Sequence, residues 1–199
     1  GYRHMCRLFS GPLLASLPAL APFDWLLRLD TDSFLLGPVT RDPFQVVSFG
    51  AFKYGWIGAF KDEPYFVTGL GDLTTQWMRE SGLKPAVLQQ WLGYHLALEG
   101  IHPSEGSYDD VRFCFATNFF IVSSKFLQSP EMWSFFRTLD DSGGFYRYRW
   151  GDACVHFLAV AALLDRDRDT VQLHMDVPYW HQGTVSMPES NAYFTSDKY

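Results

Sequence analysis

Short strand-like runs alternate with longer helical patterns along this sequence, and this alternation limits the accessible folds more than any other feature. The apolar run 25–29 meets acidic residues and then Gly37-Pro38, which predicts a buried strand that ends in a loop. Residues 46–60 are rich in β-branched and aromatic side chains with scattered glycines, which favours one or two strands over a helix. Residues 111–122 form a further strand-like run.

Helical periodicity fills the segments between these runs. Apolar residues recur at three- and four-residue spacings in 73–80 and 85–98, which predicts a pair of amphipathic surface helices. Pro130 suits a first helical turn, so we expect a helix over 130–139 that breaks at the following Asp-Asp-Ser-Gly-Gly. Residues 152–164 begin with an acidic residue and stay apolar for three turns, as a buried helix does.

The end of the chain completes this pattern. A last strand is predicted within 171–178, leading into an aromatic loop, and 189–199 has the composition of a polar tail. Strands that alternate with helices favour an α/β architecture with a mixed sheet flanked by helices. A length of 199 residues fits one domain better than several modules.

Composition excludes several classes of protein. The chain is 47% hydrophobic and 19% charged, which supplies a core and argues against disorder. A net charge of −6 argues against general nucleic-acid binding, because it would repel a phosphate backbone. No apolar run approaches the length of about 18 residues needed to span a bilayer. The nearest candidate, 12–27, is interrupted by prolines and an Asp, which disfavours a signal peptide.

Three cysteines, Cys6, Cys114 and Cys154, stand far apart without a CxxC pair. This spacing excludes a zinc cluster and allows at most one disulfide, whose pairing the sequence leaves open. The sequence begins at Gly1 without an initiator Met, so we expect it to be part of a longer protein.

The strongest candidate for a metal site is Asp30-Thr31-Asp32. It follows the strand predicted at 25–29, and side chains two residues apart share one face of a strand. Two carboxylates on one face suit Mg²⁺ or Mn²⁺. An ion bound in this way keeps coordination positions open for a diphosphate. On pattern alone, an acidic turn without a metal is the commoner interpretation.

Four other polar positions also have structural explanations. His181 lies in an aromatic segment and could be a Mn²⁺ ligand, but in isolation a structural role is favoured. Asp152 precedes the predicted buried helix, where a helix cap is the simpler role. His156 lies on the same helical face as Asp152, so a local contact or a core histidine are both open. His4 lies between two arginines that could pair with phosphates or with a carboxylate.

Taken together, several segments resemble the fungal α-1,2-mannosyltransferases of glycosyltransferase family 15. That family's pattern contains YRHMCRF, DWYWR before an acidic motif, DPF, SNFE, GGFxYERWGDAPVH and an aromatic pair before a His. The corresponding blocks occur here in the same order: Tyr2–Arg7, Asp24-Trp25 with Arg28 ahead of Asp30, Asp42-Pro43-Phe44, Thr117-Asn118-Phe119, Arg149–Asp152 with Val155-His156, and Tyr179-Trp180-His181.

The resemblance implies a single glycosyltransferase catalytic domain over 1–199, of glycosyltransferase A type, whose N-terminal part lies upstream. It implies a Mn²⁺-dependent, retaining transfer of mannose from GDP-mannose to a mannose 2-hydroxyl of an oligosaccharide. Family correspondence makes Asp30, Asp32 and His181 metal ligands. It also places Asp152 near the acceptor as a catalytic carboxylate, and Tyr2 and Arg3 beside the donor.

The chain departs from the family pattern at three places. Phe120 stands where the family has the Glu of SNFE, discussed as a nucleophile or acceptor contact, and Tyr148 replaces the Glu of YERWGD. The acidic motif is Asp-Thr-Asp in place of a form that begins with Glu and Pro. These changes keep open a different donor sugar or a non-catalytic, glycan-binding relative. A glycoside hydrolase ranks last, because the motifs give Asp152 no second carboxylate partner.

Location and partners follow from the resemblance alone. Family members are type II membrane proteins of the Golgi or endoplasmic reticulum lumen, so membrane attachment is expected only through an anchor upstream of Gly1. The expected partners are a sugar nucleotide and an oligosaccharide acceptor, with no nucleic acid.

Overall fold

A four-stranded mixed sheet forms the centre of the molecule. The computed structural model describes residues 1–98, 100–102, 106–173, 178–187 and 190–195. The sheet has the order β1 (Trp25–Leu29), β6 (Phe119–Ser123), β3 (Tyr54–Trp56) and β7 (Thr170–Gln172). The first three strands pair antiparallel, and β7 runs parallel to β3. This confirms the strand predicted at 25–29 and the mixed sheet.

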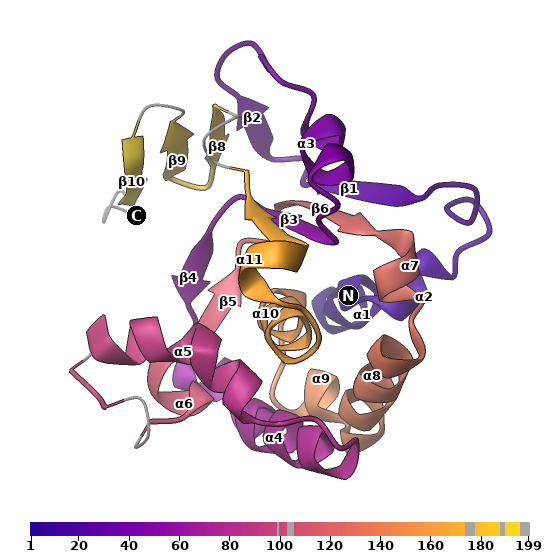
Figure 1. The fold of residues 1–199 in the computed structure, drawn as a ribbon, viewed down its shortest axis with the longest axis vertical. Helices are drawn as coiled ribbons and strands as arrows, with labels where there is room; N and C mark the ends of the chain where they lie inside the picture. Colours follow the sequence, from indigo (N-terminus) through magenta and orange to yellow (C-terminus); the bar gives the residue numbers. More distant parts are fainter. Residues whose placement is uncertain (99, 103–105, 174–177, 188–189, 196–199) are drawn as a thin grey trace.

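A second sheet lies beside the first and is antiparallel throughout (Figure 1). Its strands are β2 (Ser33–Leu35), β8 (Tyr179–His181), β9 (Thr184–Met187) and β10 (Ser190–Thr195). The aromatic loop expected after 178 was therefore wrong, as was the polar tail over 190–195. Gln182 and Gly183, with φ of 45° and 84°, join β8 to β9 in a tight turn that creates this hairpin. Within the predicted strand 171–178, residues 174–177 lie outside the described residues.

Two predicted strand regions are divided differently in the structure. The run 111–122 contains two strands, because β5 (Phe113–Phe115) pairs with β4 (Ala59–Lys61) in a separate sheet and only β6 joins the central sheet. The expectation that 46–60 lacks a helix was wrong, since α3 (Pro43–Phe49) covers its first residues.

The cause of that helix lies just before it. The Asp42 side chain accepts a hydrogen bond from the backbone N–H of Phe44, and Pro43 occupies the first turn. These start signals outweigh the strand propensity of the β-branched and aromatic residues that follow.

Helix α10 (Asp152–Leu163) passes through the middle of the fold and is buried on nearly all sides. Its sequence is apolar around the whole helix, as expected for a helix with neighbours on every face. It packs on β5 and on α5 (Ala86–Leu98), α8 (Pro130–Ser142), α1 (Tyr2–Phe9) and α4 (Leu70–Glu80) (Figure 1).

The predicted helices at 73–80, 85–98, 130–139 and 152–164 are thus all present. Two details differ. α8 continues through Asp140 to Ser142 and ends at Gly143, whose φ of 72° gives the left-handed termination. α4 and α5 are more than surface helices, because they contribute Trp77, Met78, Leu92 and other buried side chains to the core around α10.

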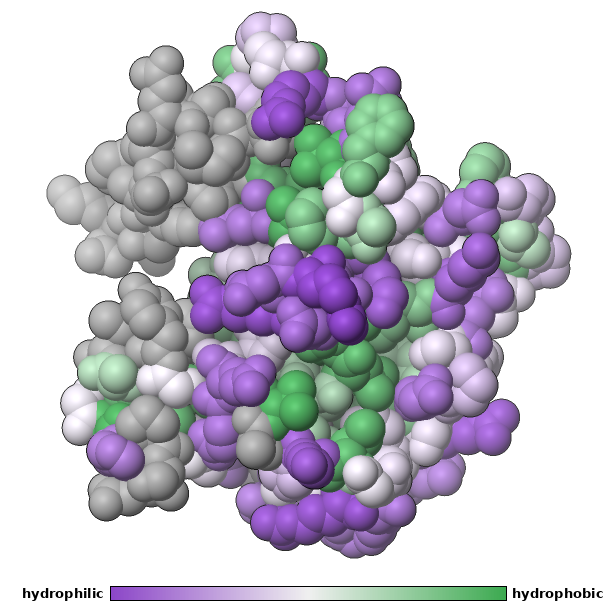
Figure 2. Space-filling model, viewed as in Figure 1, coloured by the Kyte–Doolittle hydropathy of each residue, from purple (hydrophilic) through white to green (hydrophobic). Residues whose placement is uncertain are grey.

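Short helices connect the larger elements. They are α2 (Pro12–Ala15), η1 (Pro64–Val67), α6 (Tyr108–Val111), α7 (Ser124–Leu127), α9 (Gly144–Arg147) and α11 (Arg166–Asp169). Figure 2 shows a hydrophilic band across the middle of one face, where Figure 1 draws α11, with hydrophobic side chains on either side. Among the helices of the described part, none combines the length and apolarity that crossing a bilayer requires.

Two buried contacts fix α10 against its neighbours. His156 is 1% exposed; its Nε2 donates to the carbonyl of Phe9 at 2.7 Å, and its Nδ1 accepts from Tyr54 Oη at 3.1 Å. This confirms a core histidine rather than a contact with Asp152. A disulfide joins Cys114 of β5 to Cys154 of α10, in agreement with the single disulfide that the sequence allowed.

Candidate functional site

The three predicted metal ligands converge where the two larger sheets meet. Asp30 follows β1, Asp32 precedes β2, and His181 ends β8. Strand pairing places Ser33 opposite His181, which brings the turn before β2 to the end of β8. One ligand atom from each of the three residues lies within 4.8 Å of the others, and His181 Nε2 is 3.2 Å from Asp32 Oδ1.

This donor set fits a hard or borderline divalent cation. Two carboxylate oxygens with one imidazole nitrogen suit Mn²⁺ and leave positions open for phosphate oxygens. His181 Nε2 is buried and makes no hydrogen bond within the described residues, so coordination to a cation would give this nitrogen a partner. A hydrogen bond of 2.7 Å from Gln182 Nε2 is the main reason that the pKa of Asp32 is lowered, which keeps this carboxylate ionised.

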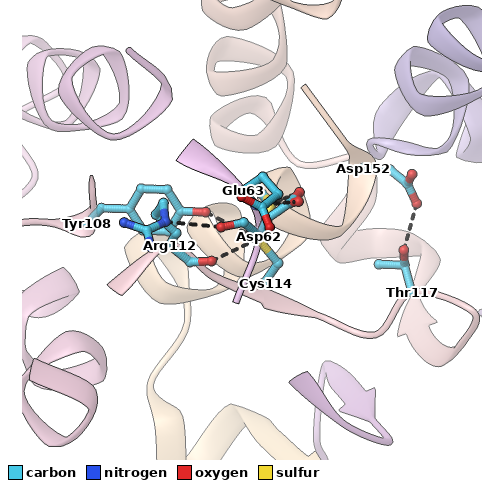
Figure 3. Close-up of a disulfide and its surroundings, with 8 residues drawn as sticks. Asp62, Glu63, Tyr108, Arg112, Cys114, Thr117 and Asp152 are labelled. Carbon is cyan, nitrogen blue, oxygen red and sulfur yellow. Dashed lines mark hydrogen bonds between the residues drawn. A yellow bond between two sulfur atoms is a disulfide. The ribbon is translucent and has the colours of Figure 1, made fainter. Parts of the chain in front are cut away.

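Arg28 connects the metal candidates to Asp152. Its Nε lies 2.8 Å from Asp30 Oδ1, and its Nη1 donates to Asp152 Oδ2. Thr117 Oγ1 donates to the same Asp152 oxygen at 2.8 Å (Figure 3). Asp152 is only 4% exposed, and the helix cap expected of it was wrong because Gly151 is the N-cap and Asp152 makes no capping bond. Its carboxylate is therefore directed across the site from the first turn of α10.

These residues border one cavity of about 440 Å³. Asp30, Asp32, His181, Asp152 and Tyr2 all line it. The lining also contains a further carboxylate that no sequence pattern marked. This is Asp62, which follows β4 and whose pKa is raised by burial. Figure 3 shows Asp62 beside the disulfide, whereas Asp152 and Thr117 lie together to one side.

Tyr2 and the two arginines of α1, Arg3 and Arg7, contact different partners. The guanidinium of Arg149 lies 4.4 Å from the ring centroid of Tyr2, whose pKa is raised to about 12 mainly by burial. Arg3 is outside the residues that line the cavity and donates to the carbonyl of Tyr146, so its donor-site role stays a prediction. Arg7 makes two hydrogen bonds to Asp140, which is the carboxylate pairing left open by the sequence.

Phe120 takes no part in this cavity. Its side chain is 1% exposed and lies between Tyr54, at a centroid distance of 5.7 Å, and His156, at 4.7 Å. Tyr148 stacks on Trp150 at 6.1 Å. Two of the three departures from the family pattern thus replace a carboxylate by an aromatic ring packed on other rings.

Several further site residues had weak sequence signals. Thr117 and Asn118 stand in the Thr-Asn-Phe block, and Gln182 begins the turn after β8. Asp62 lies in no pattern that marks a site. Only the pairing of β2 with β8 brings the turn at 30–33 to residues 150 positions later, and local sequence does not specify that pairing.

Comparison with known proteins identifies the family of the chain. The family model for glycolipid 2-alpha-mannosyltransferase matches residues 1–198, so the chain belongs to that family. The probable mannosyltransferase KTR3 of Saccharomyces cerevisiae is 32% identical over 83% of this chain and 39% of its own length. The O-glycoside alpha-1,2-mannosyltransferase homolog 4 of Schizosaccharomyces pombe is 28% identical over 90% and 46%. The chain spans less than half the length of these two curated relatives.

Solved structures establish the fold. The mannosyltransferase Ktr4p of S. cerevisiae superposes with a TM-score of 0.80 at 26% identity, over 96% of this chain and 50% of that one. Core-mannan synthase A of Aspergillus fumigatus, in its Mn/GDP form, gives 0.81 at 24% identity, over 99% and 54%. These likenesses confirm the expected α/β fold of glycosyltransferase A type.

Proposed function

We propose that the protein containing this chain is a divalent-cation-dependent glycosyltransferase that moves mannose from GDP-mannose to a mannose 2-hydroxyl of a glycan, with retention. The observation that carries the proposal is the convergence of Asp30, Asp32 and His181 at a cavity that also holds Asp152. Membership of the mannosyltransferase family supports the reaction class. Ktr4p has been solved in complex with GDP, and core-mannan synthase A in a Mn/GDP form, which supports the donor and the metal.

Each residue of the site has a distinct role in the proposed reaction. A bound Mn²⁺ would neutralise negative charge that develops on the leaving diphosphate. Asp30, Asp32 and His181 would hold it, while Arg28 keeps Asp30 and Asp152 in a fixed relation. Asp152 is held through one oxygen by Arg28 and Thr117, which suits it to orient an acceptor hydroxyl. Tyr2 forms part of the cavity wall, where it would border the donor.

Location is part of the same proposal. We place the protein in the lumen of the Golgi or endoplasmic reticulum, attached to the membrane by an anchor outside this chain. The Cys114–Cys154 disulfide supports an oxidising compartment, since such bonds persist in the secretory pathway and are rare in the cytosol.

The test is release of GDP from GDP-mannose by the full-length protein, with Mn²⁺ and mannobiose or methyl mannoside. We expect turnover that is abolished in Asp30→Ala and His181→Ala and strongly reduced in Asp152→Asn. Asp141→Ala and His4→Ala remove the same residue types outside the cavity lining and should leave turnover unchanged. Equal loss in these control variants would contradict the assigned site.

A second candidate is a relative that binds glycans without transferring sugar, and the core packing of Phe120 favours it. The family Glu at this position is replaced by a ring that offers no nucleophile or hydrogen bond, and the ring is buried and absent from the cavity lining. Tight binding of Mn²⁺ and GDP without any turnover would support this candidate. Turnover that is lost in Asp152→Asn would exclude it.

A further inference from the structure

The side chain of Asn118 links His181 to two hydroxyl groups behind it. Asn118 lies between β5 and β6, and its side-chain amide nitrogen is 2.7 Å from His181 Nδ1. Its amide oxygen is 3.0 Å from Tyr179 Oη, which in turn is 2.8 Å from Ser33 Oγ. The backbone carbonyl of Asn118 also accepts the N–H of Asp30 at 2.9 Å. One residue therefore touches two of the three proposed ligands.

The proton on the His181 ring decides whether this arrangement can hold a metal. A neutral imidazole carries a single N–H, and a nitrogen that coordinates a metal must present its lone pair. If Nε2 is the ligand, Nδ1 carries the hydrogen and needs an acceptor. In the orientation seen here, the amide of Asn118 donates to Nδ1, so the ring hydrogen lies on Nε2, where the described residues accept no hydrogen bond from it.

We propose that Asn118 is a positioning residue whose side-chain amide rotates when a divalent cation binds, so that its oxygen and nitrogen exchange places. This rotation selects the His181 tautomer that can coordinate metal. In the loaded state the amide oxygen accepts the Nδ1 hydrogen and the amide nitrogen donates to Tyr179 Oη. Tyr179 then donates to Ser33 Oγ. The two ends of an amide have nearly the same shape, so this rotation needs no repacking of the neighbouring side chains. It reverses the direction of each hydrogen bond from His181 through Asn118 and Tyr179 to Ser33.

The inference rests on the proposed function, because it assumes that His181 is a metal ligand. Two separate observations support it. The first is the continuous chain of hydrogen bonds that joins the side chains of Ser33, Tyr179, Asn118 and His181, in which no donor–acceptor distance exceeds 3.0 Å. The second is the buried Nε2, 3.2 Å from Asp32 Oδ1, which lacks a hydrogen bond.

Two variants of Asn118 separate its accepting and donating roles. Asn118→Asp can only accept, so it should keep the affinity for Mn²⁺ within a few-fold of wild type or raise it. Asn118→Leu can do neither and should weaken binding by about 10- to 100-fold, as loss of an outer-shell partner of a ligating histidine does. Affinity is measured by calorimetric titration of the full-length protein with Mn²⁺ alone, after circular dichroism has shown that each variant is folded.

A second measurement reads the tautomer directly. ¹⁵N NMR of the His181 ring in the Zn²⁺-loaded wild-type protein, assigned with His181→Ala, should show the hydrogen on Nδ1, whereas the metal-free protein should show it on Nε2. An unchanged affinity in Asn118→Leu, an equal loss in folded Asn118→Asp and Asn118→Leu, or a hydrogen that stays on Nε2 would overturn the role of Asn118. If the wild-type protein binds no Mn²⁺, the metal site of the proposed function falls first, and the role of Asn118 falls with it.

Discussion

At the scale of single residues, the site depends on charges that neutralise one another before any ligand arrives. Arg28 has a side chain that is 11% exposed and contacts the carboxylates of both Asp30 and Asp152. Its guanidinium also lies 4.2 Å from the ring centroid of Phe9. Asp152 is buried, so without Arg28 its carboxylate would lose its cationic partner and keep the hydroxyl of Thr117 as a hydrogen-bond donor.

We therefore predict that Arg28→Met lowers the free energy of unfolding by about 3 kcal/mol, because it leaves a buried carboxylate unpaired. Adding Asp152→Asn to this variant should recover part of the loss, since the uncompensated charge is then removed. Urea denaturation measures both. Arg79→Met, at an exposed position in the last turn of α4, is the control and should change stability little. Equal losses for Arg28→Met and Arg79→Met would contradict this role of Arg28.

His156 gives a prediction on pH. Burial lowers its pKa from the usual 6.5, so the folded protein holds this ring neutral while the unfolded chain protonates it. The unfolded state then binds more protons below pH 6.5, so stability is complete above that pH and falls as the pH decreases further.

The comparison uses urea denaturation of the wild-type protein and of His156→Gln between pH 7.5 and 5. His156→Gln should be less stable at pH 7.5, because it disturbs the bonds to Phe9 and Tyr54, but its stability should depend less on pH. The same pH dependence in both proteins would show that His156 does not set it.

At the scale of elements, the disulfide joins the two-stranded sheet of β4 and β5 to the central helix α10. Cys114 and Cys154 are 40 residues apart, and the bond ties β5 to the first turn of α10, where Asp152 is placed. Reduction should lower the free energy of unfolding by about 2–5 kcal/mol, mainly because a closed loop restricts the unfolded chain.

Guanidinium denaturation with and without dithiothreitol measures this loss. Cys154→Ser should abolish the effect of dithiothreitol, whereas Cys6→Ser should keep it, because Cys6 is a free, buried thiol. Its pKa is raised to about 11, chiefly by burial, which leaves it largely unreactive. Insensitivity of the wild-type protein to reductant would contradict a structural disulfide.

The helices and strands show how much of this fold could be predicted from the sequence. The strand at 25–29 and the helix from Asp152 were clear, since their patterns agree with strong start or stop signals. The helix at 43–49 was missed because strand propensity was weighed above the Asp42-Pro43 cap. The hairpin of β8 and β9 was missed because it depends on tertiary pairing with β2. The strand-end pattern marked Asp30 and Asp32, and the family resemblance joined His181 to them. The contacts of Asn118, Gln182 and Asp62 came only from the structure.

At the scale of the whole molecule, the cavity lies where the central sheet, the second sheet and the N-terminal end of α10 meet. A cation held by Asp30, Asp32 and His181 would cross-link the end of β1 to the end of β8. Since the unfolded chain lacks this arrangement, binding should stabilise the folded protein.

We predict that Mn²⁺ at 100 times its Kd raises the free energy of unfolding by about 2.7 kcal/mol and raises the melting temperature accordingly. Differential scanning calorimetry with and without Mn²⁺ measures the change. Asp32→Asn should remove most of it, whereas Asp110→Asn, an acidic residue of α6 outside the cavity lining, should retain it. A shift of the same size in Asp32→Asn would place the cation elsewhere.

Anomalous diffraction at the manganese edge, from crystals of the full-length protein grown with Mn²⁺ and GDP, would locate the metal itself. We expect a single strong peak in the cavity, within bonding distance of His181 Nε2 and of carboxylate oxygens of Asp30 and Asp32. A crystal that holds GDP but has no peak there, or whose peak is surrounded by other residues, would contradict the proposed metal site.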